Sequence, residues 1–166
     1  MSLSKHKISQ ANLVEIPNGS QFKFAIVVSQ WNKHITDKLF EGCYNVLIEN
    51  SVLSKNIFRI DVPGSFELIY GSKKAQERKV DVVISIGSII KGETEHFNFI
   101  CNAVSQGIKE LNINSKIPVI FCVLTDENIQ QSIDRSCLLY TSPSPRDQRG
   151  SGFAWWALKK KWGGGG

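Results

Sequence analysis

The sequence of 166 residues lacks any long hydrophobic run. No stretch approaches the roughly 20 consecutive apolar residues that a transmembrane helix needs. Residues 1–20 are polar and contain no apolar segment of the kind found in secretory signals, so we expect no such signal. The sequence therefore predicts a protein that has no membrane partner and is located in the cytoplasm.

The sequence also lacks the cysteine pairs that hold structural metals. Its four cysteines form no CxxC pair, and their spacing fits no zinc pattern, so we expect no metal. Cys43, Cys101 and Cys122 lie in apolar stretches. We interpret them as small buried hydrophobic residues in a reducing compartment. A catalytic thiol is the alternative.

Basic residues are unevenly spread, which bears on the class of partner. The formal net charge is +5, but residues 137–166 hold five basic residues and one acid, leaving only +1 for residues 1–136. No basic stripe with interleaved aromatic residues occurs in that larger part. Such a stripe is the usual mark of a nucleic-acid interface, so we expect no nucleic-acid partner.

Apolar segments with strand character alternate with amphipathic segments. The expected strands are 22–30, 56–62, 80–90 and 117–125, and the expected helices are 34–52, 65–78, 96–111 and 127–136. Near-continuous apolar strands separated by helices predict a parallel sheet covered on both faces, an α/β/α sandwich. Ligands of such folds bind at the carboxyl ends of the strands.

Helical spacing also predicts which side chains face the core. In the first helix these are Ile35, Leu39, Cys43, Val46 and Leu47; in the second they are Phe66, Ile69 and Tyr70; in the third they are Phe97, Ile100, Cys101, Val104 and Ile108. Thr125 or Asp126 is the expected N-cap of the last helix.

Residues 137–166 differ in kind from the rest. They show no helical or strand period and hold three of the four tryptophans. The segment CLLYTSPSPRD can be back-translated into a sequence resembling a transposon-end adapter, and the lysine and glycine runs resemble translated A- and G-tracts. We predict a read-through artefact from about Cys137 onward, with a natural low-complexity tail as the alternative. The predicted organisation is an arm at 1–20, a domain at 21–136 and a non-native tail.

The segment between the third strand and third helix has the composition of an anion-binding loop. Lys91-Gly92-Glu93-Thr94 precedes a helix that starts near His96. Backbone N–H groups at a helix N-terminus attract anions, and Gly92 permits close approach. An imidazole beside such a site suits proton transfer. An ordinary capped helix start, with His96 as a capping or core residue, is the alternative.

Other strand ends carry further candidate residues. Glu67 follows the second strand and could accept hydrogen bonds from ligand hydroxyls, or simply stabilise the start of its helix. Trp31 follows the first strand and could stack on a flat heterocycle, or pack in the core. Arg135 in the last helix could bind phosphate, or remain a solvated surface charge.

Four segments together resemble the lumazine synthase family. They are FAIVVSQWNKHITDKLFEGC, VPGSFEL, IGSIIKGETEHFNFICNAVSQGI and PVIFCVLTDENIQQSIDR, which occur in the family's order and cover roughly residues 12–136. The resemblance implies a four-stranded parallel sheet of the flavodoxin-like kind. It also implies a transferase of riboflavin biosynthesis that joins 5-amino-6-(ribitylamino)uracil to 3,4-dihydroxy-2-butanone 4-phosphate. It implies no metal and no organic cofactor.

The resemblance assigns a role to each matching position. It implies that His96 is the general acid/base, and that Gly92, Glu93, Thr94 and Arg135 bind phosphate. Trp31 would stack on the pyrimidine, with Asn32 beside it. Ser65, Phe66 and Glu67 would hold the ribityl chain, Ile89 and Ile90 would line the pyrimidine pocket, and Phe121 would enter the site from a neighbouring subunit.

The resemblance further implies a homopentamer, sometimes assembled into sixty-subunit capsids, with active sites between subunits. The sequence departs from the family's pattern at Cys122, where glycine is usual, and after Arg135, where the family's lysine-bearing loop and last helix have no counterpart. Two alternatives share the scaffold: a non-catalytic flavin or lumazine binder, and a shell-forming protein without chemistry.

Overall fold

A computed structural model describes residues 18–138. The N-terminal arm and the C-terminal tail expected from the sequence lie outside these residues, apart from 18–20 and 137–138. Strands and helices alternate along the described chain: β1 (Phe24–Ser29), α1 (Lys33–Glu49), a short 3-10 turn (Ser54–Asn56), β2 (Ile57–Val62), α2 (Leu68–Gln76), β3 (Val82–Ile90), α3 (His96–Asn114), β4 (Val119–Asp126) and α4 (Ile129–Leu138). The expected order of elements is confirmed.

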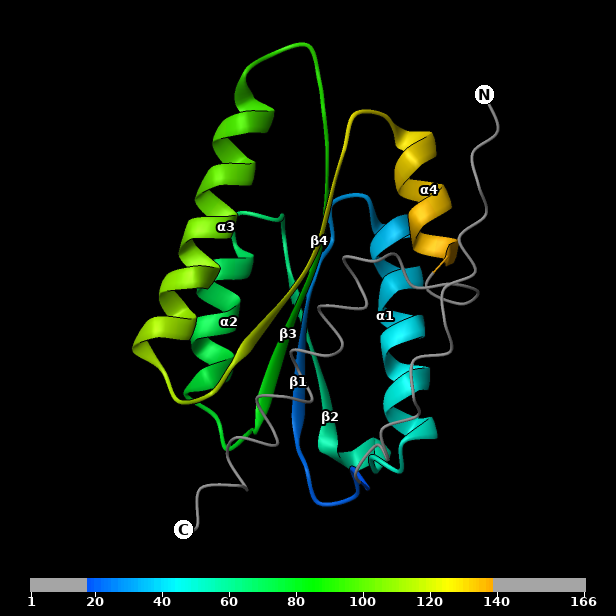
Figure 1. The fold of residues 1–166 in the computed structure, drawn as a ribbon, viewed down its shortest axis with the longest axis vertical. Coiled ribbons are helices and arrows are strands. Elements are labelled where there is room, and N and C mark those ends of the chain that lie inside the picture. The colour runs from blue at the N-terminus through cyan, green and yellow to red at the C-terminus, as the bar shows by residue number, and fades with distance from the viewer. Residues whose placement is uncertain (1–17, 139–166) are drawn as a thin grey trace, which may run out of the picture.

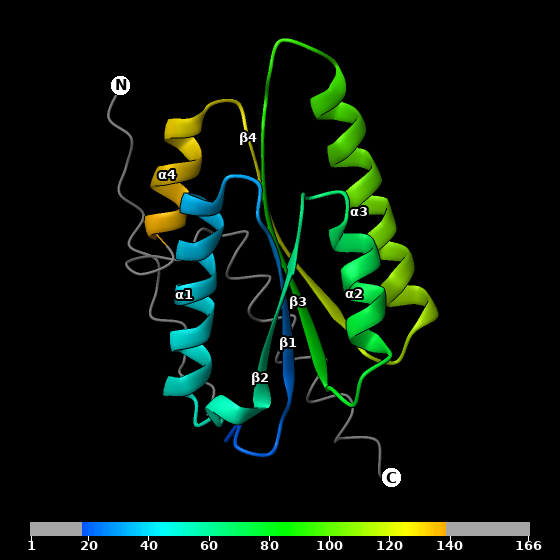
Figure 2. The same cartoon turned by 180° about the vertical axis from the view of Figure 1, so that it is seen from behind.

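The four strands form one parallel sheet in the order β2-β1-β3-β4. Helices α1 and α4 cover one face and α2 and α3 cover the other (Figures 1 and 2). This is the predicted α/β/α sandwich. From β1 the chain continues to β2 on one side of the sheet, and from β3 it continues to β4 on the other side. The direction in which successive strands are added therefore reverses between β1 and β3. Ligand pockets of doubly wound sheets form at such a switch point.

Two apolar cores lie on the two faces of the sheet. One contains Ile26, Ile86 and Leu39, and the other contains Val27, Val83 and Leu68. The central strands β1 and β3 are almost wholly buried, as their apolar sequences predict. The edge strands β2 and β4 are partly exposed, because each has only one neighbouring strand and incomplete helical cover.

The inner face expected for α2 is wrong for Phe66 and Tyr70, whereas Ile69 is half-buried. The helix buries Leu68, Gly71, Ser72 and Ala75, whereas Tyr70 is 67% exposed. Phe66, expected on the same face, precedes the helix and is 51% exposed. A Cβ at Gly71 would lie 2.8 Å from methyl groups of Val27 and Val62. The helix therefore packs closely on the sheet through its small residues, and its large aromatic residues face outward.

The other helices follow the expected spacing more closely. On α1, Ile35, Leu39 and Leu47 are buried, but Val46 is 49% exposed, contrary to expectation. On α3, Val104 and Ile108 are buried, and Phe97, Ile100 and Cys101 pack against the same core.

The predicted cap of α4 is also wrong. Thr125 and Asp126 still belong to β4, and the Asn128 side chain accepts a hydrogen bond from the Gln131 N–H at 3.0 Å, as an N-cap does. Asp126 is instead buried, with partners described below. None of the helices within residues 18–138 is long and apolar enough to cross a membrane.

Candidate functional site

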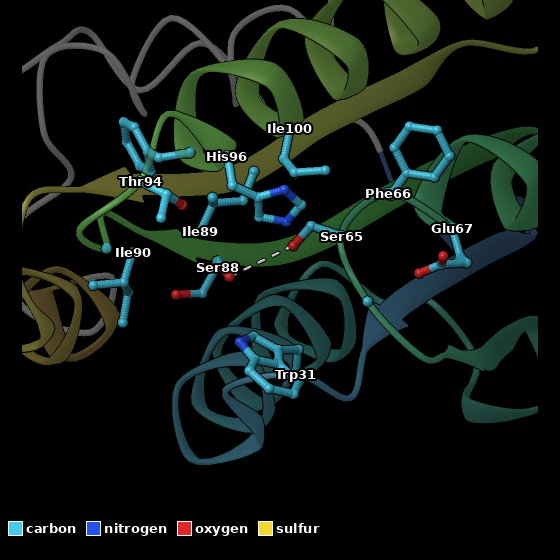
Figure 3. A pocket seen from close by; sticks show the side chains of 13 residues that line it. Trp31, Ser65, Phe66, Glu67, Ser88, Ile89, Ile90, Thr94, His96 and Ile100 are labelled. Atoms are coloured by element: carbon cyan, nitrogen blue, oxygen red, sulfur yellow. Dashed lines mark hydrogen bonds between the residues drawn. The ribbon is translucent and has the colours of Figure 1, made fainter.

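A cavity of about 530 Å³ opens at the carboxyl ends of β1, β2 and β3. It therefore lies at the switch point of the sheet. Figure 3 shows its walls coming from three separate segments: the loop after β1, the turn before α2, and the end of β3 with the start of α3. The lining residues are Trp31, Gly64, Ser65, Phe66, Glu67, Ser88, Ile89, Ile90, Gly92, Thr94, His96, Phe97 and Ile100.

The loop after β1 presents Trp31 to the cavity. The indole is 71% exposed, so core packing, the alternative considered from the sequence, is excluded. The loop itself is tied down, because the Trp31 N–H donates to the Pro63 carbonyl at 3.1 Å. Asn32 adopts a left-handed conformation with φ of 58°, and its side-chain amide donates to the Ser88 carbonyl at 3.3 Å. Asn32 thus joins the loop to the end of β3 without lining the cavity itself.

The turn between β2 and α2 supplies the second wall. Ser65 is buried, and its hydroxyl donates to the Ser88 carbonyl at 3.5 Å. Phe66 and Glu67 are exposed at the cavity rim. Glu67 occupies the N-cap position of α2 but makes no side-chain cap bond. Its carboxylate is therefore available to accept from a ligand rather than committed to the helix start.

The end of β3 and the start of α3 supply the third wall. Ile89 is 9% exposed and lines the cavity together with Gly92, Thr94 and His96. Figure 3 shows the His96 imidazole directed into the cavity near Ile89 and Ser65. His96 is the first residue of α3, where the helix dipole favours an anion. Thr94 does not cap α3, because Glu95 holds the cap position.

A family model described as 6,7-dimethyl-8-ribityllumazine synthase matches residues 21–158. The chain belongs to the 6,7-dimethyl-8-ribityllumazine synthase family. The match runs past residue 136, where the sequence led us to expect the native part to end.

Relatives named 6,7-dimethyl-8-ribityllumazine synthase are identical to this chain at about half of the aligned positions. The enzyme of Christiangramia forsetii is 52% identical over 138 residues, which cover 82% of each chain. The enzyme of Flavobacterium johnsoniae is 54% identical and that of Flavobacterium psychrophilum 55% identical. Each aligns over 137 residues that cover 82% of this chain and 72% of the relative.

Most positions expected from the family resemblance meet in this one cavity. Asn32 does not line the cavity but hydrogen-bonds to the lining residue Ser88, and Glu93 is exposed on the loop between Gly92 and Thr94 without lining the cavity. Phe121 and Arg135 lie elsewhere. Phe121 is on the edge strand β4 and is 40% exposed, and Arg135 is on α4, against the opposite face of the sheet from α2 and α3.

Four lining residues were not singled out from the sequence. Gly64 and Ser88 are neighbours of the expected Ser65 and Ile89, and their only signal was that adjacency. Phe97 and Ile100 were assigned to the core from their helical spacing. They do pack on the core, but the first turn of α3 also borders the cavity, so both roles apply.

Neither Cys43 nor Cys101 is an activated nucleophile. No disulfide joins the cysteines within residues 18–138, and Cys43, Cys101 and Cys122 are partly rather than fully buried, which corrects the expectation. Burial raises the pKa of the Cys43 thiol far above its usual range, and desolvation also raises the pKa of Cys101. A thiol with a raised pKa holds little thiolate near neutral pH. Within residues 18–138, no group of three or more His, Cys, Asp or Glu side chains is placed to hold a metal ion.

Proposed function

We propose that this cavity joins 5-amino-6-(ribitylamino)uracil to 3,4-dihydroxy-2-butanone 4-phosphate and releases 6,7-dimethyl-8-ribityllumazine, phosphate and water. The observation that carries the proposal is the convergence of Trp31, Glu67, Gly92 and His96 on one cavity in a member of this family. An aromatic plate, a carboxylate, an anion-binding loop and an imidazole are the groups that the two substrates require.

The diamine occupies the part of the cavity nearest the sheet. Its flat pyrimidine stacks on the Trp31 ring and contacts Ile89 and Ile90, all of which line the cavity. Its ribityl chain extends toward the turn before α2. There the Glu67 carboxylate accepts from the sugar hydroxyls, with Ser65 and Phe66 beside it.

The phosphate of the second substrate binds at the start of α3. Gly92, Glu93 and Thr94 form the loop that receives it, and the helix N-terminus adds partial positive charge. A Cβ at Gly92 would meet no atom within 4 Å, so the space over this residue is open to a ligand. No metal and no organic cofactor enter the proposed reaction.

The reaction proceeds through a Schiff base. The 5-amino group attacks the substrate ketone, and a first water leaves as the Schiff base forms. Loss of phosphate from C4 leaves an enol, which tautomerises to a ketone at C3 and a methyl group at C4. The ribityl-bearing nitrogen attacks the C3 ketone, and a second water leaves as the ring closes. His96 is the general acid/base that moves protons to and from the leaving oxygens. Since the diamine is already a nucleophile, holding both substrates in register supplies much of the rate enhancement.

The test is a spectroscopic assay on the full chain. Mixed with both substrates, the protein should generate the lumazine absorption band and release one phosphate per lumazine. A protein that shifts the spectrum of added flavin but forms no lumazine would be a binder on this scaffold. An assembled but inactive and non-binding protein would be a shell component. Either result contradicts the proposal.

Trp31→Ala should weaken binding of the diamine without lowering stability. Stacking of a base on an aromatic side chain contributes about 1–3 kcal/mol, equivalent to roughly 5- to 150-fold in affinity. The ring is 71% exposed in the free protein, so its removal leaves no core cavity. Trp31→Phe is the matched control and should retain most of the affinity. Fluorescence titration with the diamine measures both, and equal affinities for Ala and Phe variants would contradict stacking.

We further propose a homo-oligomer, pentameric or capsid-forming, in which active sites lie between subunits, and a cytoplasmic location. The positions of Phe121 and Arg135 support shared sites, because neither lines the cavity of its own chain. Both could instead complete the cavity of a neighbour. Partly buried cysteines that form no disulfide within residues 18–138 suit a reducing compartment.

Mixing two variants tests the shared site. Trp31→Ala removes a lining residue from the subunit's own cavity. Phe121→Ala instead removes the side chain that the subunit contributes to the cavity of its neighbour. Subunits exchanged between the two variants should form some undamaged sites and recover activity above that of either variant alone. Light scattering measures the assembly. A monomer, or a mixture no more active than the average of its parts, would contradict the proposal.

A further inference from the structure

Asp126 is a buried carboxylate with two side-chain partners. It ends β4 and is 4% exposed. Its Oδ2 accepts from the Ser132 hydroxyl at 2.6 Å, and its Oδ1 accepts from Nη1 of Arg135. A buried charge is unfavourable unless it is paired and hydrogen-bonded, so this carboxylate is held firmly by both groups.

The same residue also anchors the start of the anion-binding loop. In the register of the sheet, Asp126 pairs with Ile90, the last residue of β3. The Lys91 N–H then donates to the Asp126 carbonyl at 2.9 Å. The backbone of Asp126 therefore fixes the first residue of the loop that leads to Gly92, while its side chain fixes a guanidinium.

Arg135 retains free donors after pairing with Asp126. A guanidinium carries five N–H groups in a rigid fork. Within residues 18–138 only Nη1 makes a hydrogen bond, and the side chain is 34% exposed. The remaining N–H groups are thus available to an oxyanion, and one edge of the fork is already immobilised.

We propose that Asp126 is a positioning residue that holds the Arg135 guanidinium ready to receive the substrate phosphate. The inference rests on the proposed function and on the phosphate-binding role that the family resemblance implies for Arg135. A long side chain that is fixed before binding loses less conformational freedom when the ligand arrives. The Asp126 side chain is buried and does not line the cavity, so it acts through Arg135.

The decisive variant is Asp126→Asn in the full chain, compared with Ser132→Ala. Asparagine keeps the size of the side chain but removes the charge that orients the guanidinium. We expect its KM for 3,4-dihydroxy-2-butanone 4-phosphate, and its Kd for inorganic phosphate measured by calorimetry, to rise about tenfold. The KM for the diamine should stay within about twofold. Ser132→Ala removes the other donor to the same carboxylate but leaves its charge beside Arg135, so each of the three constants should change by less than roughly twofold, and much less than in Asp126→Asn.

A double-variant cycle separates positioning from general stability. If Asp126 acts through Arg135, Asp126→Asn should add nothing to the KM of an Arg135→Ala chain. An unchanged phosphate affinity in Asp126→Asn, or independent addition of the two effects, overturns the proposal. If Asp126→Asn does not fold, Arg135→Lys replaces it, because an ammonium paired with Asp126 lacks the outward fork. Wild-type phosphate affinity in Arg135→Lys would likewise overturn the inference.

Failure of the inference is distinguishable from failure of the proposed function. A wild-type chain that forms no lumazine contradicts the proposed function. The comparison of the Kd for inorganic phosphate between the wild-type and Asp126→Asn chains still tests the role of Asp126. An active wild-type chain whose Asp126→Asn variant binds phosphate normally contradicts the inference alone.

Discussion

His96→Ala should slow lumazine formation about 100-fold without abolishing it, because a positioned general acid or base contributes about 10²–10⁴-fold. The imidazole lines the cavity at the first residue of α3. Its removal takes away proton transfer but leaves the stacking plate, the carboxylate and the anion-binding loop in place. The substrates would still be held together, and the amine would still attack the ketone.

Steady-state kinetics on His96→Ala measures this effect as a fall in kcat with little change in either KM. His34→Ala is the matched control, since His34 is an exposed histidine on α1 that does not line the cavity. It should turn over at the wild-type rate. Complete loss of activity with intact substrate binding would mean that His96 does more than assist proton transfer, and a wild-type rate would remove it from the mechanism.

The sequence predicted the layers and sheet class because strong apolar strands alternate with amphipathic segments. It also predicted the meeting of Trp31 and His96, since carboxyl ends of parallel strands share one edge of the sheet. It misplaced part of the inner face of α2, because the helical pattern was read from the spacing of large apolar residues such as Tyr70. The helix in fact approaches the sheet closely through small residues such as Gly71.

The role of Asp126 could not be predicted from local pattern. An aspartate just before a helix resembles an N-cap, and only the register between β3 and β4 shows that it is still part of a strand. Its partner Arg135 lies nine residues further along, in α4. The same holds for Phe121, whose apolar character favours a core position although the edge of the sheet leaves it 40% exposed.

Gly87→Ala and Gly92→Ala should have opposite consequences, although the chemical change is the same. A Cβ at Gly87 would lie 2.8 Å from Cδ1 of Leu68, 2.9 Å from Oγ of Ser65 and 3.3 Å from Cγ1 of Val123. Overpacking of a core by one methyl group costs about 1–3 kcal/mol. We expect urea unfolding to show a loss of that size, and displacement of the Ser65 turn should also raise the KM for the diamine.

Gly92→Ala should leave the free energy of unfolding nearly unchanged, because its new Cβ would meet no atom within 4 Å. The methyl group would instead occupy space over the anion-binding loop, and the KM for the phosphorylated substrate should rise while the KM for the diamine does not. Gly87 in β3 is thus required because the packing beneath the site leaves no room for a side chain. Gly92 in the loop is required because the ligand needs the space above it. Equal unfolding free energies for the two variants would contradict the close contact at Gly87, and an unchanged KM in Gly92→Ala would place the phosphate elsewhere.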